Sequence, residues 1–222
     1  GMMAAINAHQ KINEEKPFIL SRDQAYIGVL IDDLITKGVD EPYRMFTSRA
    51  EYRILLRQDN ADIRLTELGH RLGLASEKRY NLLEKKIKQR DELIKFFKNY
   101  SVDPTLVNDA LNKLGTTPLK QKRKLIDLVL RPQVTIYDLK ELIPELNDFY
   151  NKLPDRNNEI FEASEILIKY SGYIEREKQI ANKLSRLEHI KIPDTFNFDE
   201  VHSLSTEARH KLKDIRPATI GQ

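Results

Sequence analysis

Apolar side chains recur along most of this chain at the three- and four-residue spacing of amphipathic helices. Helix-start signals stand between the runs, most clearly at Ser76, Asp103-Pro104 and Thr135, and Gly115 is a stop signal. The pattern predicts an all-α array of roughly eight helices with short loops and no substantial sheet. The expected ranges are 3–12, 23–37, Thr66 to Gly73, 77–100, 104–115, Thr117-Pro118 to 131, 135–142 (broken at Pro144), 158–188 and 205–214.

Two of these segments need comment. Residues 27–31 are apolar enough to suit a strand or a helix, and the following Asp32, Asp33 and Leu34 favour a helix. The longest segment, 158–188, places its apolar residues within one broad stripe that we expect to face the core. The stripe consists of Phe161, Leu167, Tyr170, Ile174, Ala181, Leu184 and Leu187.

Candidate chemistry is scarce. The chain has no cysteine, which excludes disulfides and thiolate sites, and no apolar run long enough to span a bilayer. No glycine-rich phosphate loop or nucleophile motif occurs. Asp32 and Asp33 are adjacent on the expected helix, so we expect them to face solvent. We interpret the five histidines, none in a metal-binding pair, as surface residues: His9, His70, His189, His202 and His210.

The formal net charge of +3 is too small to indicate a partner, so the placement of the arginines matters more. Between Gly38 and Glu77 there is no lysine but there are six arginines. Arginine without lysine suits two-pronged contacts to phosphate or carboxylate and stacking on bases. The six are Arg44, Arg49, Arg53, Arg57, Arg64 and Arg71.

If Ser48 caps a helix, then Arg49, Arg53 and Arg57 follow at four-residue steps and share about 80° of one helical face. Such a row could contact successive phosphates of a nucleic acid. The alternative is internal pairing with nearby carboxylates, or with an acidic neighbour outside this chain. The sequence leaves both readings open. The carboxylates in range are Glu51, Asp59, Asp62 and Glu67.

The stretch EPYRMFTSRAEYRILLRQDNADIRLTELGHRLGL strongly resembles the signature segment of the tRNA-modifying flavoprotein family called glucose-inhibited division protein A, or MnmG. The resemblance continues in AYIGVLIDDLITKG, LVLRPQVTIYDL, KYSGYIEREKQI and IPDTFNFDEVHSLSTEARHKLKDIRPATIGQ, and so covers essentially the whole chain. Members of this family act with the GTPase MnmE on carbon 5 of the wobble uridine of certain tRNAs, in the cytoplasm, using FAD and NADH.

The resemblance implies that this chain is the C-terminal helical region, with no cofactor of its own and no catalytic residue. It implies that residues 1–20 are the remnant of the final helix and linker of the FAD domain. Residues 21–75 would form an arginine-rich junction, and residues 76–222 the C-terminal helical domain without its tail. The expected partners are tRNA, MnmE and the parent FAD domain, with a homodimer as a further option and no membrane.

The candidate tRNA-binding residues are then Arg44, Arg49, Arg53 and Arg57, with Arg64 and Arg71 as weaker candidates. A second hypothesis comes from another class of protein. The chain would be a helical protein–protein interaction module whose arginines serve only the junction between domains.

Overall fold

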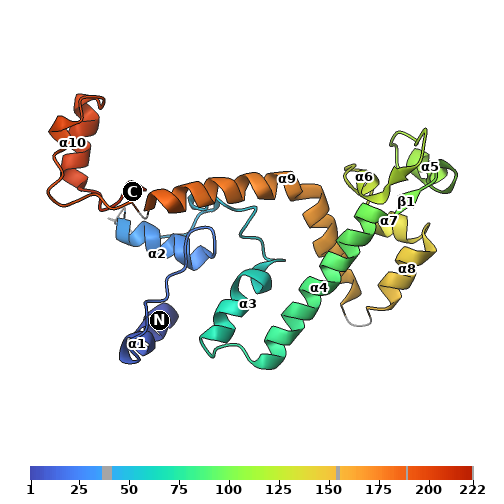
Figure 1. Ribbon diagram of the computed structural model, residues 1–222, viewed down its shortest axis with the longest axis horizontal. Coiled ribbons are helices and arrows are strands. Elements are labelled where there is room, and N and C mark those ends of the chain that lie inside the picture. Colours follow the sequence, from blue (N-terminus) through green and yellow to red (C-terminus); the bar gives the residue numbers. More distant parts are fainter. Residues whose placement is uncertain (37–41, 154–155, 189, 222) are drawn as a thin grey trace. The chain divides into compact units, whose positions relative to one another are not determined.

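The computed structural model describes residues 1–36, 42–153, 156–188 and 190–221, and it is mainly helical (Figure 1). Within these residues, two strands of two residues each pair antiparallel, β1 (Ser101–Val102) and β2 (Arg123–Lys124). The prediction of an all-α array is confirmed. The described helices are α1 (Met2–Ile12), α2 (Tyr26–Thr36), η1 (Thr47–Arg49), α3 (Ala61–Arg71), α4 (Glu77–Asn99), α5 (Pro104–Lys113), α6 (Leu125–Val129), α7 (Ile136–Lys140), α8 (Pro144–Asn151), α9 (Asn157–Glu188), η2 (Phe198–Glu200) and α10 (Thr206–Ile215).

Several helices begin where local capping chemistry predicts. The Ser76 hydroxyl accepts a hydrogen bond from the N–H of Arg79 at the start of α4. At α7, Thr135 and Asp138 form a reciprocal capping box. Gly115, with φ of 67°, follows the end of α5 in the left-handed conformation that glycine adopts readily. The end predicted for α2, at Gly38, lies outside the described residues.

Two of the sequence signals predict the wrong boundary, and a third predicts a break but not the helix that begins there. Thr66, the predicted N-cap, lies buried inside α3, which begins at Ala61. Pro144 separates α7, which ends at Lys140, from the next helix, as predicted, but it is also the first residue of α8, where its missing N–H costs nothing. No helix begins at Thr117-Pro118. There the side-chain amide of Asn108 holds both backbone groups of Leu119, which satisfies them without a helix.

The predicted core stripe of α9 is partly wrong. Phe161, Ile174 and Ala181 are buried as expected, but Tyr170 and Leu184 are 48% and 41% exposed. The apolar stripe is wider than the part of the helix surface that other elements cover, so residues at the edges of the stripe remain exposed to solvent.

The chain divides into two compact units, each described here by itself. Unit 1 comprises residues 1–55 and 176–222, and unit 2 comprises residues 56–175. The three-part division expected from the sequence stays a prediction.

Unit 2 contains the main hydrophobic core. The short helices α5 to α8 gather at the C-terminal end of α4 (Figure 1), and their apolar faces close over it. Many of the core side chains are inaccessible to solvent, so this unit holds the best-protected apolar surface of the chain. Its fully buried members include Leu93, Phe97, Val107, Leu125, Leu128, Ile136, Ile143, Leu146, Ile160 and Phe161.

A buried lysine joins three helices of unit 2. The Lys86 side chain on α4 is 1% exposed, and its Nζ donates to Asp62 Oδ2 on α3 (2.8 Å) and lies 2.6 Å from Glu159 Oε1 on α9. Burial alone would raise the pKa of Glu159, but hydrogen bonds from Arg156 and Lys86 lower it below its ordinary value. The buried ammonium of Lys86 is therefore paired with two carboxylates, and the pairs connect α3, α4 and α9.

Unit 1 is less enclosed. No residue of α1 is buried, whereas α2 buries Gly28, Val29 and Asp33. The 3-10 helix η2 packs against α10. An isolated antiparallel backbone bridge joins Lys191, which precedes η2, to Thr219, which follows α10.

Candidate nucleic-acid interface

The arginine-rich segment folds into turns, whereas its spacing predicted an α-helix. Residues 47–49 form the 3-10 helix η1, and residues 51–56 form turns and a bend. The N–H of Leu55 donates to the C=O of Tyr52 (2.9 Å), a three-residue step. An α-helix would step by four residues.

Burial explains the difference. Tyr52, Leu55 and Leu56 would share one face of an α-helix, but Ala50, which is also buried, would lie on the opposite face. A single helix could not bury all four side chains against one neighbouring surface. Tertiary packing overrides the helical pattern here. The predicted row on one helical face is therefore wrong, and each of its members must be judged by its own contacts: Arg49, Arg53 and Arg57.

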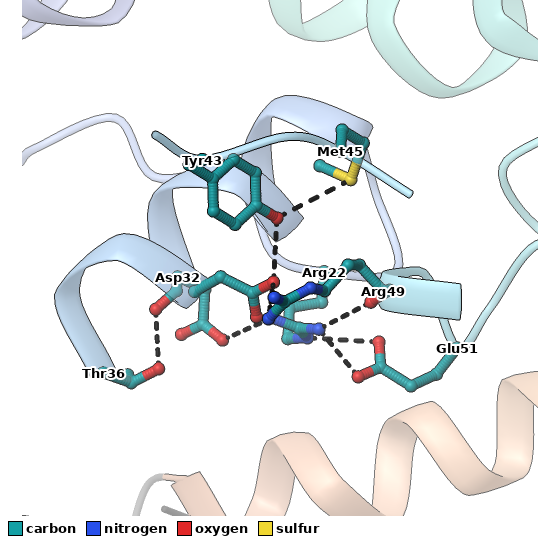
Figure 2. A network of polar contacts seen from close by, with 8 residues as sticks. Arg22, Asp32, Thr36, Tyr43, Met45, Arg49 and Glu51 are labelled. Atoms are coloured by element: carbon teal, nitrogen blue, oxygen red, sulfur yellow. Dashed lines mark hydrogen bonds and ion pairs between the residues drawn. The ribbon is translucent and has the colours of Figure 1, made fainter. Parts of the chain in front are cut away.

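Arg22, which precedes α2, is the hub of unit 1 (Figure 2). Its Nη1 donates to Asp32 Oδ2 (2.8 Å) and Asp33 Oδ1 (2.7 Å). Its Nη2 donates to the backbone carbonyl of Arg49 (2.9 Å) and to Glu51 Oε1 (2.7 Å), and its Nε donates to Glu51 Oε2 (3.2 Å). One guanidinium thus joins α2 to the arginine-rich segment, using the planar fork that lysine lacks.

The guanidinium of Arg22 stays protonated in this network. Burial alone would lower the pKa of Arg22, but hydrogen bonds to Glu51, Asp33 and Asp32 outweigh it and raise the pKa above its ordinary value. The three carboxylates face two arginines, Arg22 and Arg49, so the group carries a formal charge of −1 (+2 and −3).

Asp33 is the buried anion of the network, with 1% of its side chain exposed. Its Oδ2 accepts a hydrogen bond from the Tyr43 hydroxyl (2.8 Å) and lies 3.7 Å from Arg49 Nη1. The Arg49 guanidinium also lies over the Tyr43 ring, 5.5 Å from its centroid. Burial and the bond to Asp33 raise the pKa of Tyr43, which keeps the hydroxyl a donor. The expectation that both aspartates face solvent is wrong for Asp33.

Gly28 lets α2 approach the chain that carries Arg22. A Cβ at position 28 would lie 2.4 Å from the carbonyl oxygen of Ser21 and 2.5 Å from that of Leu20. Both atoms belong to the backbone, so neither can rotate away. The absence of a side chain at Gly28 therefore sets the distance across which Arg22 reaches the two aspartates.

Arg57 and Arg64 make contacts within unit 2, at the start of α3. Arg57 grips Asp59 with Nε (3.0 Å to Oδ1) and Nη2 (3.1 Å to Oδ2). Arg64 donates from Nε to Asn60 Oδ1 (2.8 Å) and from Nη2 to the carbonyl of Arg57 (3.1 Å). These two arginines organise the N-terminus of α3, as the internal-pairing alternative predicted for Arg57 with Asp59.

Arg44, Arg53 and Arg71 are the exposed arginines of the set; Arg44 and Arg53 belong to unit 1, and Arg71 ends α3 in unit 2. The Arg44 guanidinium lies 5.4 Å from the ring centroid of Phe46, which is itself 53% exposed. Within the described residues, no carboxylate pairs with Arg44 or Arg53. Arg49 is intermediate, because its side chain is 41% exposed while its nearest carboxylate is 3.7 Å away.

Sequence reasoning missed Arg22 and Tyr43. One usable signal was present: Asp33 follows Val29 by four residues on an apolar helix, so burial of Val29 implies burial of Asp33. A buried carboxylate requires a cationic or hydrogen-bonding partner. Which residue supplies it depends on contacts distant in sequence, and the spacing along the chain does not reveal them.

In the part of the chain that is described, no group of three or more metal-ligating side chains occurs, and none of the helices is long and apolar enough to cross a bilayer. Of the histidines, His9, His202 and His210 are exposed, as expected, while His70 is half-buried and stacks on Tyr80. His189 lies outside the described residues.

Comparison with known proteins identifies the class. Residues 77–178 match the model of the tRNA modifying enzyme MnmG/GidA C-terminal helical domain, and residues 180–222 match that of the MnmG/GidA C-terminal helical bundle. These matches define the chain as the C-terminal helical part of a tRNA-modifying enzyme. It belongs to the MnmG/GidA family.

Relatives and solved structures agree with this assignment. The chain is 59% identical over 223 residues to the tRNA uridine 5-carboxymethylaminomethyl modification enzymes MnmG of Parabacteroides distasonis and Bacteroides fragilis. It is covered completely in both comparisons but spans only 36% of each relative. The structure of Aquifex aeolicus GidA (form II crystal) superposes with a TM-score of 0.71 at 39% identity, over 98% of this chain and 33% of that one.

Proposed function

We propose that this chain is the tRNA- and partner-binding region of an FAD-dependent enzyme that, with the GTPase MnmE, modifies carbon 5 of the tRNA wobble uridine. The observation that carries the proposal is a lysine-free segment with two exposed arginines in unit 1, in a chain of the MnmG/GidA family. Arg44 and Arg53 contact the tRNA backbone, and Arg49 adds a contact at the edge of its network. The enzyme works in the cytoplasm, where its tRNA substrate is found.

The other two candidates take a different role. Arg57 and Arg64 hold the start of α3 and act on tRNA only by positioning that helix. Their guanidinium groups already bind Asp59 and Asn60, so a phosphate would have to compete with these contacts.

FAD and NADH do not fit the residues described here. A dinucleotide needs a glycine-rich turn between a strand and a helix to receive its pyrophosphate. Among the described glycines, the two with positive φ, Gly73 and Gly115, follow the helices α3 and α5 and are not preceded by a strand. We therefore assign both cofactors to the parent enzyme outside this chain and derive no step through them.

The competing function is a helical interaction module whose arginines serve only the domain junction. Its support is the internal contacts of Arg49, Arg57 and Arg64, together with the exposed apolar side chains Met2 and Ile12 of α1. Exposed apolar surface of this kind suits the parent FAD domain, MnmE or a second copy of the chain.

The two functions are separated by charge reversal of the exposed arginines in the complete protein. The variant is Arg44→Glu with Arg53→Glu, and the matched control is Arg176→Glu with Arg186→Glu, two exposed arginines of α9 in the same unit. We expect weaker tRNA binding and a salt slope flatter by about one unit per lost phosphate contact in the first variant only. FAD content and melting temperature should not change. Wild-type affinity and slope in a folded Arg44/Arg53 variant would leave the interaction module as the better reading.

A further inference from the structure

A run of basic side chains in unit 2 plays no part in the arginine network. Between Asp109 and Asp127 the sequence holds five basic residues and no acidic one. This local charge of +5 exceeds the formal net charge of the whole chain, +3. All five residues are exposed, and four of them lie in residues 120–124, here called the basic loop: Lys113, Lys120, Lys122, Arg123 and Lys124.

The backbone around the basic loop is held at several points. The side-chain amide of Asn108 donates to the carbonyl of Leu119 (3.0 Å) and accepts from its N–H (2.7 Å). Arg131 donates to the carbonyl of Thr117. At the other end, β2 pairs with β1 beside the C-terminal end of α4 (Figure 1). The loop therefore presents its charges from an ordered backbone, which reduces the entropy lost on binding.

Little of this charge is neutralised within unit 2. Lys122 Nζ lies 3.5 Å from Asp103 Oδ2, but both side chains are more than half exposed, and such pairs are worth at most about 1 kcal/mol. Lys124 Nζ donates to the carbonyl of Asn99 (2.6 Å), a neutral acceptor. Within the described residues, no ion pair engages Lys120. The charges therefore remain available to an external anion.

The chemistry of the surface selects the kind of anion. In residues 116–124, Leu119 is 8% exposed and Pro118 is the one exposed apolar residue, so the loop offers much charge and little apolar area. A protein interface has an apolar centre and a membrane surface takes up apolar side chains, but a phosphate backbone requires only positive charge. Lysine, which dominates here, binds phosphate as a point charge, and contacts to phosphate carry no sequence information.

We propose that the basic loop is a second contact for the tRNA phosphate backbone, carried by unit 2 and separate in sequence from Arg44 and Arg53. The proposal rests on the proposed function, since it takes tRNA as the ligand. It adds a surface that binds any stretch of phosphate backbone, independent of sequence, to the arginine surface of unit 1.

The test measures tRNA binding by the complete protein between about 50 and 200 mM salt. The variant carries Lys120→Gln, Lys122→Gln and Arg123→Gln. The control carries Lys78→Gln, Lys85→Gln and Lys88→Gln, three exposed lysines of α4 in the same unit. Both variants lose the same three charges, so a general effect of net charge would affect them equally.

Three lost phosphate contacts should flatten the slope of log affinity against log salt by roughly 2 to 3 units in the loop variant alone. Between 50 and 200 mM salt, the fold loss of affinity should then be about 16 to 64 times smaller for the loop variant than for wild type. A folded loop variant with the wild-type affinity for tRNA and the wild-type salt slope overturns the proposal, even if the variant binds a protein partner less tightly. Equal losses in loop variant and control overturn it too. If wild type binds no tRNA at all, the proposed function itself fails.

Discussion

At the residue scale, the arginines of this chain differ in what they contact, although the sequence presents them as one set. Arg22 and Arg49 share the buried carboxylate of Asp33, and Arg57 grips Asp59. Arg44 and Arg53 have no such partner among the described residues. The same fork geometry serves folding in the first group and is available for recognition in the second.

Double-mutant cycles measure how much two contacts of Arg22, those with Asp33 and Glu51, contribute to stability. Arg22→Met leaves the Asp33 carboxylate buried without its main partner, so we expect a loss of roughly 3 kcal/mol in the free energy of unfolding. The coupling energy with Asp33→Asn should exceed that with Glu51→Gln, because Asp33 is 1% and Glu51 51% exposed. Chemical denaturation measures both couplings. Equal coupling energies would show that burial does not decide the strength of these pairs.

At the element scale, close packing at one glycine governs where α2 lies. Position 28 has no room for a methyl group against the carbonyls of residues 20 and 21. At position 172, on α9, a methyl group would meet nothing within 4 Å. Packing therefore requires glycine at position 28 but not at position 172.

Gly28→Ala should destabilise unit 1 by about 1–3 kcal/mol, because two backbone carbonyls would have to move. Gly172→Ala should instead stabilise the chain by about 0.5–1 kcal/mol, since alanine restricts the unfolded chain and fits the helix. Thermal unfolding of both variants checks the prediction. A Gly28→Ala protein as stable as wild type would mean that α2 does not need this close approach.

Elements whose signals are local could be predicted from the sequence. Ser76 and Thr135 cap α4 and α7 through groups within three residues, so the sequence alone reveals them. Thr117-Pro118 carries a similar signal, but Asn108, from a separate helix, satisfies the backbone that follows. The predicted arginine row is wrong for the same reason, because burial of Ala50 and its neighbours depends on distant contacts.

At the scale of the whole molecule, buried apolar surface is distributed unevenly. The continuous core lies in unit 2, around Leu93 and Phe97 of α4. In unit 1, α1 has no buried residue, and Met2 and Ile12 are 69% and 80% exposed. Stability should therefore vary along the chain.

Hydrogen exchange of the 222-residue chain should show this gradient. Amides of α1 should exchange with little protection, because few contacts oppose opening of that helix. Amides of α4 near Leu93 should exchange only through unfolding of unit 2. Mass spectrometry of peptides from both helices gives the comparison. Protection of α1 equal to that of α4 in dilute monomer would contradict the prediction.

The bond from Arg22 to position 49 is made to the backbone carbonyl. The hub therefore anchors this turn whatever side chain position 49 carries. A photoreactive amino acid installed there would sit on an anchored backbone, a few residues from Arg44 and Arg53. Its crosslinks would report what approaches this surface in the cell, and they could be sequenced as nucleotide or as peptide.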